Sequence, residues 1–238
     1  MQYQVLPHTA LFLVIVVLTG CAQTTAHTRS EAFRHPVAGT RILLLPAHIE
    51  LYELSAGGLA EPKAEWTAQA QAHITAALKE EMATRKAQLI LYQPPKNDPA
   101  KEHAHIQLVK LHDAVWGAIL THQYGFGPSL PTKKGKFDWS LGQGTNVLRE
   151  DQDADYGLFI LLRDSYASPG RIVAAAVVSA LNLFYVHPGG RQIGFASLVD
   201  LLTGDIVWFN WLESGTGDLR TDEPARKTVQ QLLTDFPL

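Results

Sequence analysis

Cysteine is nearly absent from this sequence, since Cys21 is the only one among 238 residues. A single thiol excludes an internal disulfide and a metal site built from several cysteines. Charge of one sign is not in excess either, because 20 Lys and Arg face 23 Asp and Glu, for a net charge of −3. This balance argues against a nucleic-acid partner, because proteins that bind nucleic acids normally carry a basic excess.

Long hydrophobic runs are also missing. The uncharged apolar run at residues 10–18 is too short for a membrane-spanning helix, which needs about 20 apolar residues. A short apolar segment followed by small residues is typical of an export signal. Here Thr19 and Gly20 lead directly into Cys21, and residues 18–21 look like a lipobox, where bacterial lipoproteins are cleaved and acylated. We therefore predict a signal peptide over residues 1–20 and lipid attachment at Cys21.

Acylation of Cys21 predicts a membrane-anchored protein. Several acyl chains on one residue hold a protein more firmly than the single chain that gives only marginal binding. The next residue is Ala22 and not Asp, which in lipoproteins that resemble this one goes with sorting to the outer membrane. We predict a lipidated Cys and flexible tether over residues 21–39, and a single periplasmic domain over residues 40–238.

The composition from residue 40 onward is that of a globular domain, and strand and helix patterns alternate along it. Strands are predicted at residues 41–45, 89–92 and 156–162, followed by a hairpin of residues 192–200 and 206–212. Helices are predicted at residues 65–84, 98–124, 145–150, 170–184 and 222–235. This order predicts an α/β (α+β) fold, a two-layer or three-layer sandwich with a mixed sheet, which ends in a hairpin and a helix.

Two short motifs carry a family likeness. Residues 154–159 form a turn that runs into a central strand, and residues 196–208 form a hairpin with a Thr-Gly turn that ends near Trp208. With the early strand and helix, this order resembles the periplasmic lipoproteins related to the curli secretion channel subunit, the LpoB-type activators of penicillin-binding proteins and the N-terminal domain of TolB. The resemblance implies a shared fold, in which Gly204 permits the tight turn. It assigns no functional residue except the lipidated Cys21.

Several residues are candidates for a metal, phosphate or catalytic site, and each also has a purely structural interpretation. His103, His105 and His112 lack the spacing of a helical zinc site, so we interpret them as surface or edge histidines and predict no metal and no cofactor. Gly142 and Gly144 lack the third glycine of a phosphate loop. The serines at 165, 168 and 197 lack the Gly-x-Ser-x-Gly elbow, and nothing in the sequence places a His and an Asp beside them.

Charged clusters leave one enzymatic alternative open. Glu50, Glu53, Glu61 and Glu65 could act as paired carboxylates of an envelope enzyme on cell-wall or glycan substrates, although a solvated loop and helix start explains them as well. Three lysines at 133, 134 and 136 could meet anionic headgroups or serve as a solubilising surface.

The favoured function is non-enzymatic. The segment 170–184 is apolar nearly all round, which is typical either of a buried helix or of one that meets another protein. Residues 124–144 are predicted to form a long exposed loop, and loops of this length are uncommon unless they are functional or disordered. We predict an envelope lipoprotein that binds or assembles with a protein partner through this helix or this loop, and a homo-oligomer is compatible with that role. A secretion pore would need long amphipathic hairpins with alternating lipid-facing residues, and residues 124–144 are too rich in Gly, Pro and Lys to form them.

Overall fold

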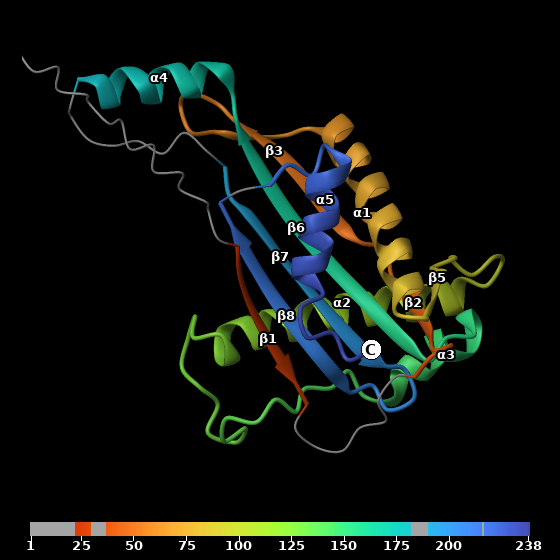
Figure 1. Ribbon diagram of the computed structural model, residues 1–238. Coiled ribbons are helices and arrows are strands. Elements are labelled where there is room, and N and C mark those ends of the chain that lie inside the picture. The colour runs from red at the N-terminus through yellow and green to blue at the C-terminus, as the bar shows by residue number, and fades with distance from the viewer. Residues whose placement is uncertain (1–21, 30–36, 182–189, 216) are drawn as a thin grey trace, which may run out of the picture.

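A computed structural model of the chain describes residues 22–29, 37–181, 190–215 and 217–238. Its centre is an eight-stranded mixed sheet (Figure 1). The strands are β1 (Gln23–Thr28), β2 (Arg41–Leu44), β3 (His48–Leu54), β4 (Ala60–Pro62), β5 (Gln88–Leu91), β6 (Tyr156–Ala167), β7 (Gln192–Asp200) and β8 (Ile206–Ser214). The helices are α1 (Ala64–Thr84), α2 (Pro99–Gln123), α3 (Asn146–Gln152), α4 (Pro169–Ala180) and α5 (Asp222–Leu232).

The long strand β6 organises the sheet. The strand order is β1-β8-β7-β6-β2-β5, and β3 also pairs with β6. The first part of β6 runs parallel to β2, its second part runs parallel to β3, and its other edge is antiparallel to β7. The predicted α/β (α+β) class with a mixed sheet and a closing hairpin and helix is therefore confirmed.

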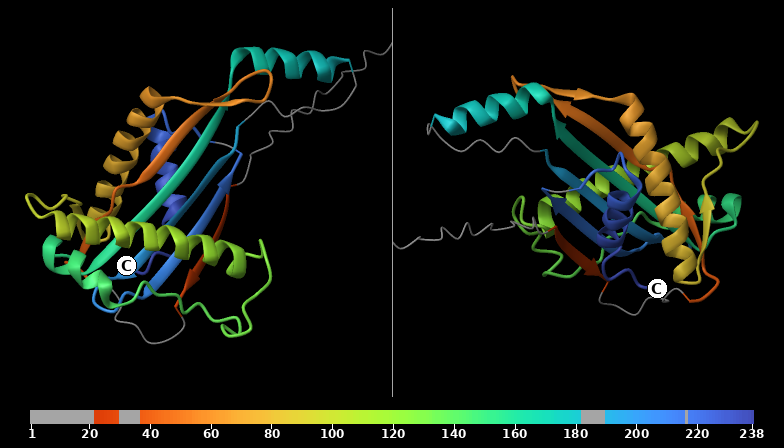
Figure 2. Two further views of the ribbon diagram at one scale, coloured as in Figure 1. Left: turned by 180° about the vertical axis from the view of Figure 1, so that it is seen from behind. Right: turned by 45° about the horizontal axis from the view of Figure 1, so that its top comes forward.

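Helices cover both faces of the sheet, so the sandwich has three layers (Figure 2). On one face, α1 and α5 pack on a core that includes Ile74, Leu78 and Trp208. Buried Asn210 of β8 holds the end of α5 on this face of the sheet, because its side-chain amide donates to the backbone carbonyls of Gln231 and Leu232 at 3.1 and 2.9 Å. The sequence predicts one apolar face of α1, and five of its residues are buried while Trp66 is half-buried against the same core; the five are Ala70, Ile74, Ala77, Leu78 and Met82.

The opposite face is covered by α2. Asp98 caps this helix as predicted, since its side chain accepts from the backbone N–H of Lys101 at 3.1 Å. The apolar stripe that the sequence predicts, Ile106, Val109, Trp116 and Leu120, is right in part: the last three are half-buried against the core, whereas Ile106 is 44% exposed. The fully buried positions are His105, Leu108, His112 and Ile119. Two of these four are histidines, which hydropathy alone does not assign to a buried face.

Three segments differ from the sequence prediction. Gln23–Thr28, predicted as flexible tether, forms the edge strand β1 and pairs with β8 over its whole length. The sequence predicts only a connecting segment with a Gly57-Gly58 turn at residues 47–62, whereas His48–Leu54 and Ala60–Pro62 form the β3–β4 hairpin around that turn. The predicted exposed loop at 124–144 contributes core residues on the α2 face, where Phe137, Trp139 and Leu141 are each less than 9% exposed. The predicted signal peptide, Cys21 and the end of the helix predicted at 170–184 lie outside the described residues.

Candidate functional site

Helix α4 exposes an apolar surface. Ser168 begins it as predicted, since its hydroxyl accepts from the backbone N–H of Arg171 at 3.2 Å. Val173, Val177 and Leu181 are 63%, 54% and 63% exposed, and Ala175 is the one residue of the helix that is buried. At 100° per residue, the exposed positions from Ile172 through Leu181 cover an arc of about 200°. Of the two interpretations made from the sequence, the buried helix is therefore wrong.

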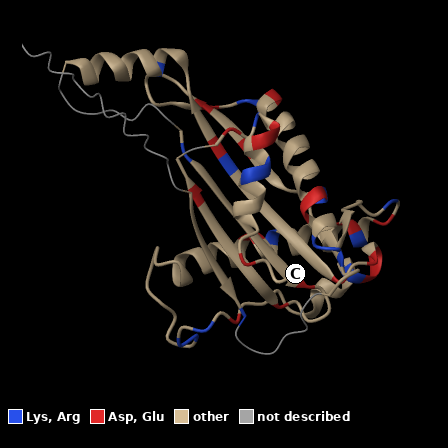
Figure 3. Ribbon diagram, in the orientation of Figure 1, with Lys and Arg blue, Asp and Glu red and all other residues tan. Residues whose placement is uncertain are grey.

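Helix α4 lies at one end of the sheet. It leaves the end of β6 and projects past the sheet instead of packing over either face (Figures 1 and 2). Figure 3 shows one basic band at its start and no acidic residue along it. A contiguous exposed apolar surface of this kind commonly marks an interaction site.

The N-terminal strand begins at this same end. Gln23 pairs with Glu213, Glu213 with Ile193, and Ile193 with Arg163 of β6, which lies four residues before the end of that strand. Strand β1 then runs away from α4, so the chain before Gln23 enters the sheet from the α4 side. Two residues of chain, which span at most about 7 Å, separate Gln23 from the predicted attachment site Cys21. The predicted anchor and the apolar helix thus share one end of the domain, which we call the α4 end.

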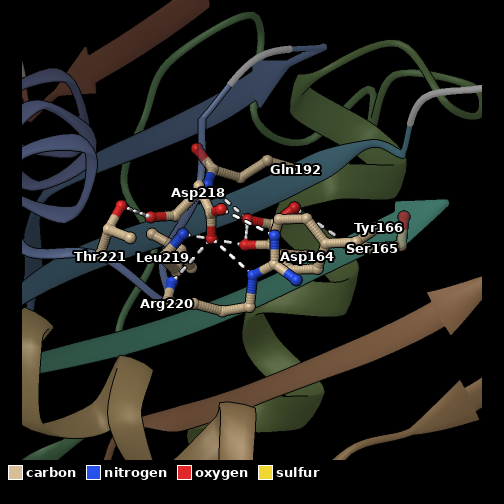
Figure 4. A network of polar contacts seen from close by, with 8 residues as sticks. All are labelled: Asp164, Ser165, Tyr166, Gln192, Asp218, Leu219, Arg220 and Thr221. Atoms are coloured by element: carbon tan, nitrogen blue, oxygen red, sulfur yellow. Dashed lines mark hydrogen bonds and ion pairs between the residues drawn. The ribbon is translucent and has the colours of Figure 1, made fainter. Parts of the chain in front are cut away.

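A polar network underlies the α4 end (Figure 4). The buried carboxylate of Asp164 on β6 accepts from the Tyr166 hydroxyl at 2.6 Å and from the Gln192 amide of β7 at 2.9 Å. The Tyr166 hydroxyl accepts from the backbone N–H of Leu219 at 2.8 Å. The side-chain carbonyl of Gln192 accepts from the hydroxyl of Thr228 of α5 at 3.1 Å. The network therefore ties together β6, β7 and α5.

Arg220 closes the network on its solvent side. Its guanidinium pairs with Asp218 at 2.7 Å and lies 3.9 Å from the centre of the Tyr166 ring. Hydrogen bonding from Arg220 lowers the pKa of Asp218, and the reciprocal hydrogen bond raises the pKa of Arg220. A cavity of about 370 Å³ opens beside the network and is lined by Asp164, Arg220 and Ile172 of α4 among others. Asp164 accepts from three protein donors, Tyr166, Gln192 and the backbone N–H of Ser165 at 2.8 Å, so the network has a structural role at the α4 end.

Burial raises the pKa of Asp164 to about 6, although the hydrogen bonds from Tyr166 and Gln192 oppose the shift. Burial is also the main reason why the pKa of Tyr166 is raised. A carboxyl whose pKa is higher in the folded than in the unfolded chain stabilises the fold at low pH. That contribution is complete below the unfolded pKa of 3.8 and is lost as the pH rises through about 6.

The Asp164→Asn variant tests this linkage. Because asparagine does not titrate, we expect the wild type to lose stability relative to the variant between pH 4 and pH 7, by at most about 1.4 kcal/mol per pH unit. Urea unfolding at several pH values measures the difference. Asp218→Asn is the control, because the folded pKa of Asp218 is lowered and its contribution has the opposite sign. Parallel curves for wild type and Asp164→Asn would contradict the assignment.

The acidic cluster does not form a catalytic pair. Glu50 is exposed and pairs with Arg163 at 3.2 Å, while Lys63 lies 2.7 Å from Glu53 and 3.4 Å from Glu61. Glu65 is also exposed. Each of the first three carboxylates is thus neutralised by a cation at the surface, where surface ion pairs contribute little to stability. This geometry gives the enzymatic alternative no support.

Two predicted surface histidines are buried. His105 is 1% exposed and lies between the Asp151 carboxylate at 3.2 Å and the Tyr92 hydroxyl at 3.1 Å. His112 is 2% exposed and its Nε2 lies 2.6 Å from the Ser197 hydroxyl. His103 is exposed, as predicted. In the described part of the chain no three His, Cys, Asp or Glu residues lie close enough together to hold a metal ion.

The His112–Ser197 pair resembles part of a hydrolase site, and the sequence analysis did not find it. Ser197 is fully buried, and the adjoining cavity has a volume of about 10 Å³, which admits no substrate. Burial lowers the pKa of His112 to about 3, with a smaller contribution from His48. The pair is therefore a neutral hydrogen bond in the core.

The remaining candidate groups have structural roles. Lys133 binds Asp138 at 2.8 Å and lies 4.4 Å from the centre of the Trp139 ring. Gly142 precedes a short 3-10 helix, Gln143–Thr145, so the Gly-x-Gly segment is a turn, as interpreted from the sequence. Within the described ranges, none of the helices is both long enough and apolar enough to traverse a bilayer.

Comparison with known proteins gives little further guidance. No family model matches the sequence, and no curated protein matches it. Among solved structures, a PelC dodecamer from Paraburkholderia phytofirmans aligns with 91% of this chain and 98% of its own, at 11% identity and a TM-score of 0.43. A second PelC dodecamer from that organism aligns with 92% of this chain and 98% of its own, at 11% identity and a TM-score of 0.41. Similarity this low does not establish a shared fold or function.

Proposed function

We propose that this protein is a bacterial envelope lipoprotein, anchored in the outer membrane through Cys21, whose periplasmic domain binds or assembles protein partners without a catalytic role. The observation that carries the membrane-anchored part of the proposal is the α4 end. An apolar helix that a free soluble domain would not expose lies at the end where the chain from Cys21 enters the sheet. The anchor thereby orients the domain, with the α4 end toward the bilayer and the opposite end toward the periplasm.

The chemistry of the described residues agrees with a binding role. The one Ser–His contact is buried, and the glutamates at 50, 53 and 61 lie at the surface in ion pairs. Catalytic groups need access to substrate and a pKa matched to their task. None of the described groups named above has both the access to substrate and the matched pKa that catalysis needs.

The Cys21→Ala variant tests the anchor. We expect it to lose the label from a radioactive fatty acid and to leave the membrane fraction, because the residue that receives the acyl chains is gone. Gln23→Ala is the control, since this exposed residue lies two positions further along, and it should keep both the label and the membrane attachment. Label retained in Cys21→Ala would contradict the proposal.

Cells that produce the wild-type protein or one of its variants also test the partner-binding role. Chemical crosslinking in intact envelopes should capture a reproducible set of proteins on the wild type. The double variant Glu53→Gln/Glu61→Gln should capture the same set, because those carboxylates are not assigned a role. Absence of any captured protein would contradict the assembly role. A cell-wall phenotype of this double variant equal to that of a deletion would favour the enzymatic alternative.

A further inference from the structure

We propose that α4 is itself a membrane-binding element, which lies in the headgroup and outer acyl region of the bilayer and acts as a second attachment beside the acylated Cys21. This inference rests on the proposed function, because the anchor supplies the bilayer. It specifies that lipid covers the exposed apolar surface of α4.

The width of the apolar surface favours lipid over a protein groove. A helix that packs into a protein core or groove needs an apolar stripe of about 100°. The exposed arc of α4 is about twice as wide, and it includes Ile172, Val173, Ala176, Val177 and Leu181. Acyl chains surround a helix on every side that they reach, so a wide arc is what a bilayer can cover.

The position of α4 favours the same partner. At most about 7 Å of chain separates Gln23 from the proposed anchor at Cys21, and Gln23 is paired through β8 and β7 with Arg163 of β6, so the anchor would hold the bilayer surface near the end of β6. Arg163 lies three strand spacings, about 14 Å, from Gln23, and six residues, about 20 Å, before Pro169 at the start of α4. The start of α4 therefore lies about 20–25 Å from Gln23, without any change in the fold.

Length and charge define how α4 lies. Its 12 residues span about 18 Å, whereas the hydrocarbon core is about 30 Å thick, so the helix enters one leaflet and does not cross the bilayer. Backbone hydrogen bonds inside the helix and the Ser168 cap on the Arg171 N–H satisfy the groups in its middle and at its start, and entry into an apolar phase requires such pairing. The helix carries no acidic residue, and its one charged side chain, Arg171, lies in the first turn, where it suits phospholipid headgroups.

The test measures depth in the bilayer at one engineered thiol. Since acylation removes the thiol of Cys21, Val173→Cys in the mature lipoprotein offers a single site for an environment-sensitive fluorophore. The matched control is Leu202→Cys, because Leu202 is also an exposed apolar residue, 45% against 63% for Val173, but lies in the turn at the opposite end of the sheet. Both proteins are placed in vesicles of phosphatidylethanolamine and phosphatidylglycerol that contain lipids with a quencher at a known depth.

We expect a blue-shifted emission at position 173 and strongest quenching by labels about 5–10 Å below the headgroups, at least about twofold above that at position 202. Equal and weak quenching at both positions, with the protein still floating with the vesicles, would overturn the inference and leave the anchor intact. Crosslinking between two copies through the 173 thiols, without quenching, would overturn it in favour of a second copy of this chain. Failure of the lipoprotein to float would contradict the anchor and with it both proposals.

Discussion

Gly204→Ala should destabilise the protein by about 3–5 kcal/mol, because two costs add at this position. Gly204 has a φ of +79°, which confirms the positive φ predicted for the hairpin turn and is unfavourable for any residue with a Cβ. In addition, a Cβ at this position would lie 2.0 Å from the carbonyl oxygen of Gly142, which is far inside contact distance. The backbone around Gly142 would have to move.

The displacement would spread into the core. The backbone N–H of Leu141 donates to the Gly204 carbonyl at 2.7 Å, and that of Ile206 donates to the Trp139 carbonyl at 3.0 Å. A shift of the turn therefore disturbs the segment that buries Trp139 and Leu141 on the α2 face.

Gly39→Ala is the matched control for this prediction. Gly39 has a φ of +86°, and a Cβ there would meet nothing within 4 Å, so only the backbone strain remains, at about 1–2 kcal/mol. Chemical denaturation of both variants measures the difference. Equal losses would show that contact with Gly142 adds no cost.

His112→Ala should destabilise the protein by about 2–4 kcal/mol at neutral pH. The substitution removes a ring stacked on Phe159, with centroids 3.8 Å apart, and leaves a cavity between α2 and the sheet. It also leaves the buried Ser197 hydroxyl without the imidazole 2.6 Å away. His103→Ala on the same helix is the control, and we expect a change within about 0.5 kcal/mol because His103 is exposed.

The loss at His112 should also depend on pH. Because burial lowers the folded pKa of His112 to about 3 from 6.5, the neutral ring stabilises the fold above pH 6.5 and that contribution is lost as the pH falls toward 3. Alanine has no such dependence, so the gap between wild type and variant should narrow from pH 7 to pH 5. Thermal or urea unfolding at the two pH values measures it, and a constant gap would mean that His112 is not held neutral by the fold.

The α4 prediction shows why burial is hard to infer from one segment. The alternation of strands and helices predicted the helix at this place, and Ser168 began it as expected. Its apolar composition suits a buried helix and an exposed helix that meets another protein equally well. Only the path of β6, which carries α4 past the end of the sheet, separates the two interpretations.

The missed elements have a common cause. Strand β1 is polar, with the sequence Gln-Thr-Thr-Ala-His-Thr, and belongs to the sheet because β8 offers it a free edge. Edge strands need no apolar face, so hydropathy does not reveal them. The two histidines on the inner face of α2 were assigned to the surface for a related reason, since His105 and His112 are polar residues whose hydrogen-bond partners lie outside the helix.

The sequence by itself determined the features that depend on neighbouring residues. The α/β class, the start of α2 at Asp98, the start of α4 at Ser168 and the turn at Gly204 all follow from local periodicity, capping and backbone freedom. Tertiary structure alone decided which surfaces are buried, because burial depends on contacts between residues far apart in the chain. It paired His112 with Ser197, placed Trp139 in the core, added β1 to the sheet and left α4 exposed at the end of the sheet where β1 begins.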